Sequence, residues 1–228
     1  THGQDMLTWG GVVGILVLGS LAYGYKNLQG QSAYGKSVVE LAKTLTPDKV
    51  VLSESHFIGP KNADITVVEF ADFYCPSCRQ AYEDMHKVME QYSTKIRFAF
   101  SNYPLFEKEG HEQSLMAAAF TIYADEKGHY WDVVQRLFEV KVEEITGEEQ
   151  LLAVLQSTGL DTADFMKRFK SGDAKLLDPL AKVQADATKY GVDRTPTWII
   201  FAKGQTPRYV SNRLSDALNE PQYQALLK

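Results

Sequence analysis

The sequence predicts an α/β domain that follows an apolar N-terminal segment. Two short apolar runs, Ile65–Ala71 and Thr197–Ala202, have the length and the β-branched and aromatic content of buried strands. Between them, apolar residues recur every three or four positions over several stretches, which is the period of amphipathic helices. Strands that enclose a helical stretch indicate a single mixed domain.

Composition is consistent with one globular core and an appendage. The chain has 228 residues, of which 44% are hydrophobic and 23% charged, enough for one sizeable core. The net charge is -5 and no long run of Lys or Arg occurs, so a nucleic acid partner is not expected. Two cysteines are too few for a disulfide-dense scaffold, and the core must depend on apolar burial.

Residues 1–26 are expected to form one transmembrane anchor. They contain the uncharged run MLTWGGVVGILVLGSLAYGY, whose 20 residues suffice to cross a hydrocarbon layer of about 30 Å as a helix. Trp9 lies near one end of the run and Tyr23 and Tyr25 near the other, where interfacial aromatic residues usually lie. A secretory signal peptide, with small residues at positions 20–22 as its cleavage site, is the alternative. Either interpretation places the remaining chain outside the cytoplasm, on the periplasmic or cell-surface face.

Residues 27–56 are interpreted as a polar connector with a short amphipathic helix, which spaces the following domain from the membrane. Its apolar residues are Val38, Val39, Leu41, Ala42 and Leu45.

Both cysteines stand in the stretch FADFYCPSCRQAY, residues 70–82, at the end of the first predicted strand. Apolar residues recur at helical intervals after it, so the motif lies where a helix begins. Unpaired backbone amides and the helix dipole stabilise an anion there, which predicts a lowered pKa and a nucleophilic role for Cys75. Cys78 follows one turn later and is expected to be the resolving thiol.

The two residues between the cysteines suit this position. Pro76 fits the first helical turn, where its missing amide hydrogen breaks no bond within the helix. Ser77 adds no charge and offers a hydroxyl to the Cys75 sulfur.

A cysteine pair of this spacing has two other common uses, a zinc site and a permanent disulfide. Half of a zinc site would need a second cysteine pair or a close histidine pair, and the sequence has neither, so no metal is expected. A permanent disulfide across so short a loop would constrain the unfolded chain little. Redox activity of Cys75 and Cys78, without a bound cofactor, is the favoured interpretation.

Three motifs in order, VVEFADFYCPSC, SNYPLFEKEGHEQSLMAAAF and GVDRTPTWIIFAKG, resemble the DsbA-like thiol:disulfide oxidoreductases of the thioredoxin superfamily, and most closely the membrane-anchored members. The resemblance covers residues 57–204. It implies a thioredoxin fold over residues 57–228, with a helical subdomain inserted at about residues 110–185. The dipeptide between the cysteines is Pro-Ser, where the best-known members have Pro-His.

The resemblance also implies site roles. Thr195 and Pro196 match the loop that faces the cysteines, where a cis peptide bond exposes backbone groups to a substrate strand. Glu69 matches an acid beneath the resolving cysteine, where burial would raise its pKa and let it exchange a proton with Cys78. Asp72 is expected to be a turn or surface acid, and His111 a structural residue outside the site.

The function implied is the introduction of disulfides into reduced or unfolded exported proteins, followed by reoxidation by a quinone-linked membrane protein. A reductase or isomerase of the same fold is an alternative, because the direction of transfer depends on the reduction potential. A non-catalytic accessory subunit of a membrane complex, bound through the N-terminal helix, is another.

Further elements predicted by periodicity complete the domain. They are helices within residues 115–123, 131–138, 151–155 and 176–187, an edge strand at Arg208–Val210 and a last helix around residues 215–227.

Overall fold

A computed structural model describes residues 45–53, 56–211 and 213–228 of the chain. In this part, a five-stranded mixed sheet has the strand order β1-β3-β2-β4-β5. Central β2 runs parallel to β3 and antiparallel to β4. The strands are β1 Phe57–Ile58, β2 Ile65–Ala71, β3 Ile96–Asn102, β4 Thr197–Ala202 and β5 Arg208–Val210. The predicted α/β class is therefore confirmed, and the three strands predicted from the sequence have the expected bounds.

Strand β2 is buried along its whole length, because both of its neighbours are strands and helices cover both of its faces. Glu69 pairs in register with Phe100 of β3 and Trp198 of β4. Successive side chains alternate between the faces, so Glu69 shares a face with Val67 and Ala71. That face belongs to the apolar cluster that also contains Cys78.

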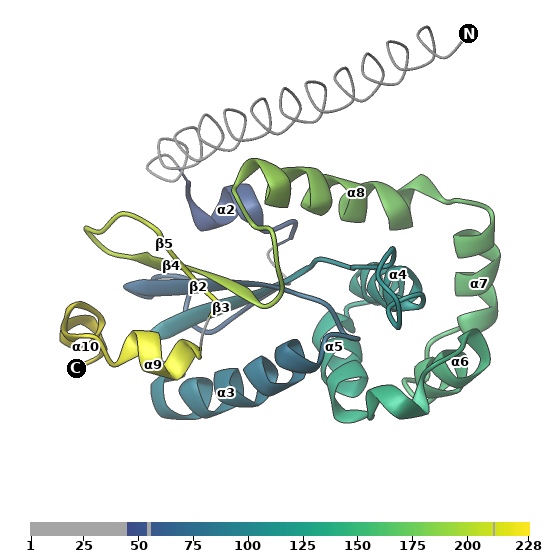
Figure 1. Cartoon of the computed structure of the whole chain (residues 1–228), viewed down its shortest axis with the longest axis horizontal. Coiled ribbons are helices and arrows are strands. Elements are labelled where there is room, and N and C mark those ends of the chain that lie inside the picture. The colour runs from purple at the N-terminus through teal and green to yellow at the C-terminus, as the bar shows by residue number, and fades with distance from the viewer. Residues whose placement is uncertain (1–44, 54–55, 212) are drawn as a thin grey trace, which may run out of the picture. The chain divides into compact units, whose positions relative to one another are not determined.

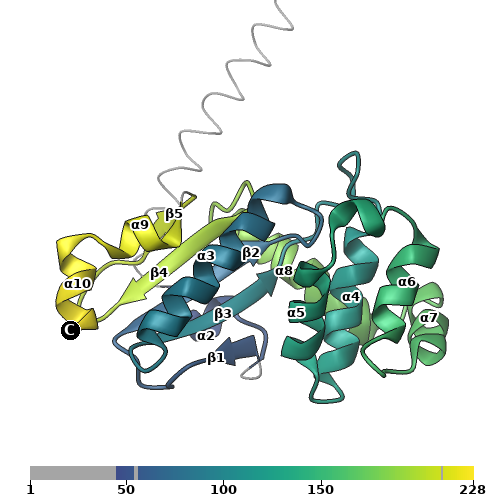
Figure 2. The same ribbon diagram turned by 90° about the horizontal axis from the view of Figure 1, so that it is seen from below.

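Two helical layers sandwich the sheet (Figures 1 and 2). One face carries α3, Pro76–Tyr92, and α9, Leu214–Leu218. The opposite face carries α2, Pro47–Val50, and α8, Ala174–Lys189. The chain ends in α10, Pro221–Leu227. Helix α3 turns Ala81, Met85 and Val88 toward the core, which matches the predicted helical period.

The helices between β3 and α8 form a group beside the sheet. They are α4 Ser114–Asp125, α5 Tyr130–Glu139, the short 3₁₀ helix η2 Val142–Glu144, α6 Glu148–Gln156 and α7 Thr162–Lys170. Helix α4 lies inside this group and is buried from Met116 to Ala124, because small and apolar residues occupy all sides of it. The group is anchored to the sheet layer through contacts of α4 with α8.

Some elements differ from the sequence expectation. Strand β3 and helix α7 were not among the predicted elements, and α7 buries a single residue, Phe165, which leaves little apolar periodicity to detect. The last predicted helix is two helices in the structure. Pro221 begins α10, and since proline cannot donate a backbone hydrogen bond, it cannot continue α9.

The predicted transmembrane anchor and all of the connector helix except Leu45 lie outside the described residues. Over the ranges that the structure does describe, none of the helices combines the length and the apolar character needed to cross a membrane.

Candidate active site

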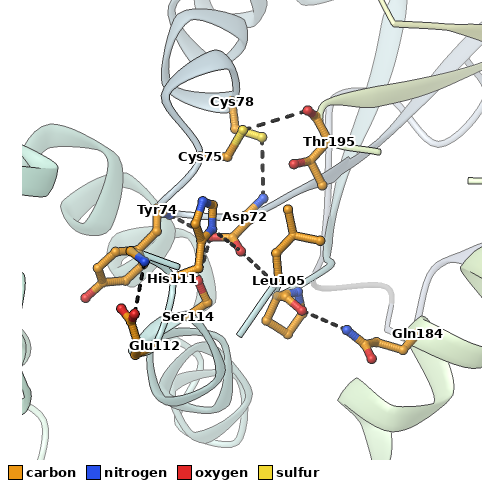
Figure 3. A network of polar contacts seen from close by, with 12 residues as sticks. Asp72, Tyr74, Cys75, Cys78, Leu105, His111, Glu112, Ser114, Gln184 and Thr195 are labelled. Carbon is orange, nitrogen blue, oxygen red and sulfur yellow. Dashed lines mark hydrogen bonds and ion pairs between the residues drawn. The ribbon is translucent and has the colours of Figure 1, made fainter. Parts of the chain in front are cut away.

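Cys75 sits at the N-terminal cap of α3, directly after the turn that leaves β2 (Figure 3). Its carbonyl accepts hydrogen bonds from the amides of Cys78 at 3.0 Å and Arg79 at 3.2 Å, which begin the helix. Pro76 occupies the first turn, where its missing amide hydrogen has no consequence. Both Cys75 and Cys78 are free thiols in the structure.

The pKa of Cys75 is lowered from 9.0 to about 5. The largest cause is a hydrogen bond from the Cys78 thiol, with smaller contributions from the Thr195 side chain and the backbone amides of Cys78 and Ser77. Burial opposes the shift. As a thiol, Cys75 donates to the Thr195 carbonyl at 3.7 Å. The Thr195 hydroxyl is buried and otherwise unbonded among the described residues, so it can donate to the thiolate instead.

Cys78 has the opposite character. It is fully buried, and its pKa is raised, first by burial, then by its hydrogen bond to Cys75 and by the nearby Glu69 carboxyl. The Asp72 amide donates to the Cys78 sulfur at 3.5 Å. Two thiols one helical turn apart therefore have opposite pKa shifts, which favour the ionised form of Cys75 and the protonated form of Cys78.

Glu69 is fully buried, and neither of its carboxyl oxygens has a hydrogen-bond partner in the described part of the chain. Burial raises its pKa well above the ordinary value, and the negative charge on Cys75 raises it further. A carboxyl group that stays protonated next to Cys78 is a proton donor and acceptor of the kind that thiol exchange needs.

Thr195 lies 120 residues from Cys75 in the chain, and its peptide bond to Pro196 is cis, as the resemblance implies. Ser77 is exposed, and no hydrogen bond from its hydroxyl to the Cys75 sulfur occurs in the structure; its backbone amide acts instead. A groove of about 420 Å³ lies beside the motif, with Ser77, Gln80, Pro196 and Arg213 in its lining. The groove thus borders both the first turns of α3 and the loop at Pro196.

The interpretation of Asp72 as a surface acid is wrong. Asp72 does form a turn, but its side chain is buried. The carboxyl oxygen Oδ1 accepts from the Tyr74 amide at 2.6 Å and the Ser114 hydroxyl at 2.8 Å. Oδ2 accepts from the Leu105 amide at 2.6 Å and lies 3.1 Å from Nδ1 of the buried His111 (Figure 3). These five residues are called the Asp72 cluster below.

Arg79 joins the cysteine helix to the helical group and was also missed. Its guanidinium donates to the carbonyls of Leu137, Phe138 and Val140 at the C-terminal end of α5. The only sequence signal for a role of Arg79 is its position immediately after Cys78. Its hydrogen-bond acceptors are backbone carbonyls, which a pattern of side chains cannot reveal. Burial lowers the Arg79 pKa.

Histidine, cysteine and acidic side chains do not gather in groups of three or more that could hold a metal ion within the described ranges. The chemistry available from the residues of the site is thiol exchange and proton transfer.

Comparisons with known proteins agree with this geometry. A family model described as Thioredoxin matches residues 52–219. The chain is 25% identical over 205 residues to a protein of Bacillus cereus named "Probable disulfide bond formation protein D", with 86% of this chain and 87% of that protein covered. It is 27% identical over 183 residues to Na(+)/H(+) antiporter NhaA 3 of Salinispora tropica, with 80% of this chain covered but only 26% of the antiporter. The chain thus spans about a quarter of the length of the antiporter relatives that it matches.

Solved structures share the fold. A thioredoxin-like oxidoreductase from Silicibacter pomeroyi aligns with a TM-score of 0.62 at 22% identity, covering 77% of this chain and 95% of that one. Oxidised BdbD from Bacillus subtilis aligns with a TM-score of 0.60 at 21% identity, covering 75% and 92%. The family match over residues 52–219 shows that the chain belongs to the thioredoxin family.

Proposed function

We propose that the Cys75–Cys78 pair introduces disulfides into exported proteins. The observation that carries the proposal is the contrast between the two thiols. Cys75 has a pKa of about 5 and contacts the Thr195 carbonyl, whereas Cys78 is buried with a raised pKa. An ionised Cys75 stabilises the reduced enzyme, and a stabilised reduced form makes the corresponding disulfide a stronger oxidant.

The size of this effect follows from the pKa. At pH 7, a thiol of pKa about 5 gains ~2.7 kcal/mol from ionisation, at about 1.36 kcal/mol per pH unit. A thiol with the ordinary pKa of 9.0 gains almost nothing. For a two-electron couple, ~2.7 kcal/mol corresponds to a reduction potential ~60 mV higher. Cys78 adds nothing at this pH, because it is protonated in either case.

The reaction proceeds in two exchanges. A substrate thiolate attacks the Cys75 sulfur, the Cys75–Cys78 bond breaks, and Cys78 leaves as a thiolate that takes a proton from the Glu69 carboxyl group. A second substrate thiolate then attacks the substrate sulfur of the mixed disulfide, and Cys75 leaves as a stabilised thiolate. The substrate loses two electrons and the enzyme gains them. Glu69 recovers its proton from solvent.

Substrate binding is assigned to the loop at Thr195 and Pro196. The Thr195 carbonyl already faces the Cys75 sulfur, so an extended substrate segment that bonds to it would bring its own thiol to Cys75. The neighbouring groove at Ser77 and Gln80 would hold the residues that flank the substrate cysteine.

Residues 1–26 would hold the domain at the outer face of the membrane, where exported proteins arrive reduced. Reoxidation is assigned to a quinone-linked membrane protein, and tethering would raise the effective concentration of the enzyme near such a partner. The relatives named disulfide bond formation protein D support the proposed formation of disulfides.

The antiporter relatives favour a second candidate, a non-catalytic accessory subunit of a membrane complex. Their names describe sodium/proton antiporters of which this chain would be only one part. Replacing Cys75 by Ser separates the two candidates, because an enzyme loses turnover, whereas an accessory subunit still assembles with its membrane partner.

The reduction potential tests the direction of transfer against the reductase and isomerase alternative. The domain is equilibrated with glutathione buffers and the fraction of disulfide is measured. A potential near or above about -180 mV supports oxidation of substrates, whereas a potential near about -270 mV would overturn it in favour of reduction.

A further inference from the structure

Both the backbone and the side chain of Asp72 form hydrogen bonds that hold the turn between β2 and the two cysteines. Its carboxyl group accepts from four donors, two of them backbone amides and two of them side chains on the chain segment that follows β3. Its backbone carbonyl accepts from the Cys75 amide at 3.1 Å. Its own amide donates to the Cys78 sulfur at 3.5 Å. One buried residue therefore contacts both cysteines through its main chain and is fixed through its side chain (Figure 3).

The four hydrogen-bond donors around position 72 explain why this position has an acidic side chain. An ionised carboxyl group only accepts hydrogen bonds and has room for four of them. An asparagine of the same shape would keep one accepting oxygen and present an NH₂ group to two of these donors. Two buried donors would then lose their partner, which is costly in a buried site.

We propose that Asp72, held by His111 and Ser114, is a positioning residue that stabilises the Cys78 thiolate during disulfide exchange. This inference rests on the proposed function, because it concerns a step of the same reaction. The turn held by the Asp72 cluster aims the Asp72 amide at the sulfur, where charge develops when the Cys75–Cys78 bond breaks.

The same donor acts in both directions of the reaction. When a thiolate attacks Cys75, a sulfur–sulfur bond forms at Cys75, the bond to Cys78 breaks, and its electron pair remains on Cys78. In the reverse step, the Cys78 thiolate attacks the Cys75 sulfur, the bond between Cys75 and the other sulfur breaks, and that sulfur leaves as a thiolate. A hydrogen bond to the Cys78 sulfur stabilises the leaving group in the first direction. In the reverse direction it raises the fraction of Cys78 that is ionised to the attacking thiolate.

The test measures how fast reduced glutathione opens the oxidised protein. Mixed disulfide and reduced protein are quantified by mass spectrometry after acid quenching, for the wild type and for four variants. Asp72→Asn removes the fourfold acceptor. His111→Leu removes one donor to it, while His111→Asn keeps an N–H group near the position of Nδ1. Thr121→Val serves as the control, because it removes a buried hydroxyl of α4 that bonds to Asn102 and lies outside the Asp72 cluster.

We expect Asp72→Asn to react about tenfold more slowly than the wild type, a change of ~1.4 kcal/mol in activation free energy. His111→Leu should also be slowed, and His111→Asn should recover to within about twofold of the wild type. Thr121→Val should lower the urea midpoint without slowing the reaction. The histidine pair keeps the test decisive if Asp72→Asn does not fold.

Two results among the variants would overturn the role of Asp72. One is a wild-type rate in folded Asp72→Asn or in His111→Leu. The other is equal slowing in Thr121→Val, because loss of stability alone would then explain the effect. A wild-type protein that reacts rapidly with glutathione but oxidises no reduced protein contradicts the proposed function instead and leaves the comparison among variants valid. A wild-type disulfide that glutathione opens no faster than an unactivated one would overturn both.

Discussion

Replacing Cys78 by Ala tests the origin of the acidic Cys75 thiol. In the structure, the hydrogen bond from the Cys78 thiol is the largest cause of the lowered Cys75 pKa, ahead of Thr195 and the amides at the start of α3. A hydrogen bond to a charged group contributes about 1.5–3 kcal/mol, which corresponds to ~1–2 pH units. Without it, the Cys75 pKa should rise from about 5 to about 6–7.

Cys78→Ser is the matched variant, since its hydroxyl keeps a donor at almost the same place. The pKa of Cys75 should therefore stay closer to the wild-type value in Cys78→Ser than in Cys78→Ala. Both are measured from the ultraviolet absorbance of the thiolate against pH, and independently from the pH dependence of alkylation by iodoacetamide. An unchanged Cys75 pKa in Cys78→Ala would refute the reasoning and assign the stabilisation to the backbone amides of the helix start.

Three further predictions follow from the same geometry. The reduction potential should fall by only ~30 mV per pH unit around neutrality, because reduction takes up two electrons and one proton while Cys75 stays ionised. The potential is measured in glutathione buffers at several pH values, and a slope of ~60 mV per pH unit would contradict an ionised Cys75. Glu69→Leu should stabilise the fold by about 1–3 kcal/mol in urea unfolding, since it removes an unbonded buried carboxyl group. The raised folded-state pKa of Glu69 makes wild-type stability fall as pH rises above 4.5, so the gain should be larger at about pH 8 than at about pH 5, and a gain independent of pH would argue against that titration. Arg79→Met should cost about 1.5–3 kcal/mol and speed hydrogen exchange in the last turn of α5, with unchanged exchange there as the contrary result.

Glu69→Leu also separates stability from catalysis. The variant should have a larger free energy of unfolding than the wild type and yet exchange thiols more slowly, because Cys78 would lack its nearby proton donor and acceptor. Such opposite effects of one substitution are expected where a buried polar group is retained for chemistry.

Local sequence determined the parts of this protein that depend on neighbouring residues. The length and apolar content of Ile65–Ala71 predicted the central strand, and the spacing of Cys75 and Cys78 after it predicted a thiol pair at a helix start. The three motifs with a family resemblance also brought Glu69, Thr195 and Pro196 into the predicted site. These features can be predicted from the sequence because hydrophobic periodicity, helix capping and turn formation each depend on only a few neighbouring residues.

Tertiary structure alone decided which distant polar groups meet. Asp72 has the sequence context of a turn acid, but its side-chain partners Leu105, His111 and Ser114 come from a segment more than thirty residues away. The acceptors of Arg79 are main-chain carbonyls at the end of another helix. Apolar periodicity identifies the face that a helix or strand buries, but it does not tell which polar side chain finds enough partners to be buried with it. That outcome depends on how β2, β3 and α4 are placed side by side, and this placement makes Asp72 a part of the core instead of the surface.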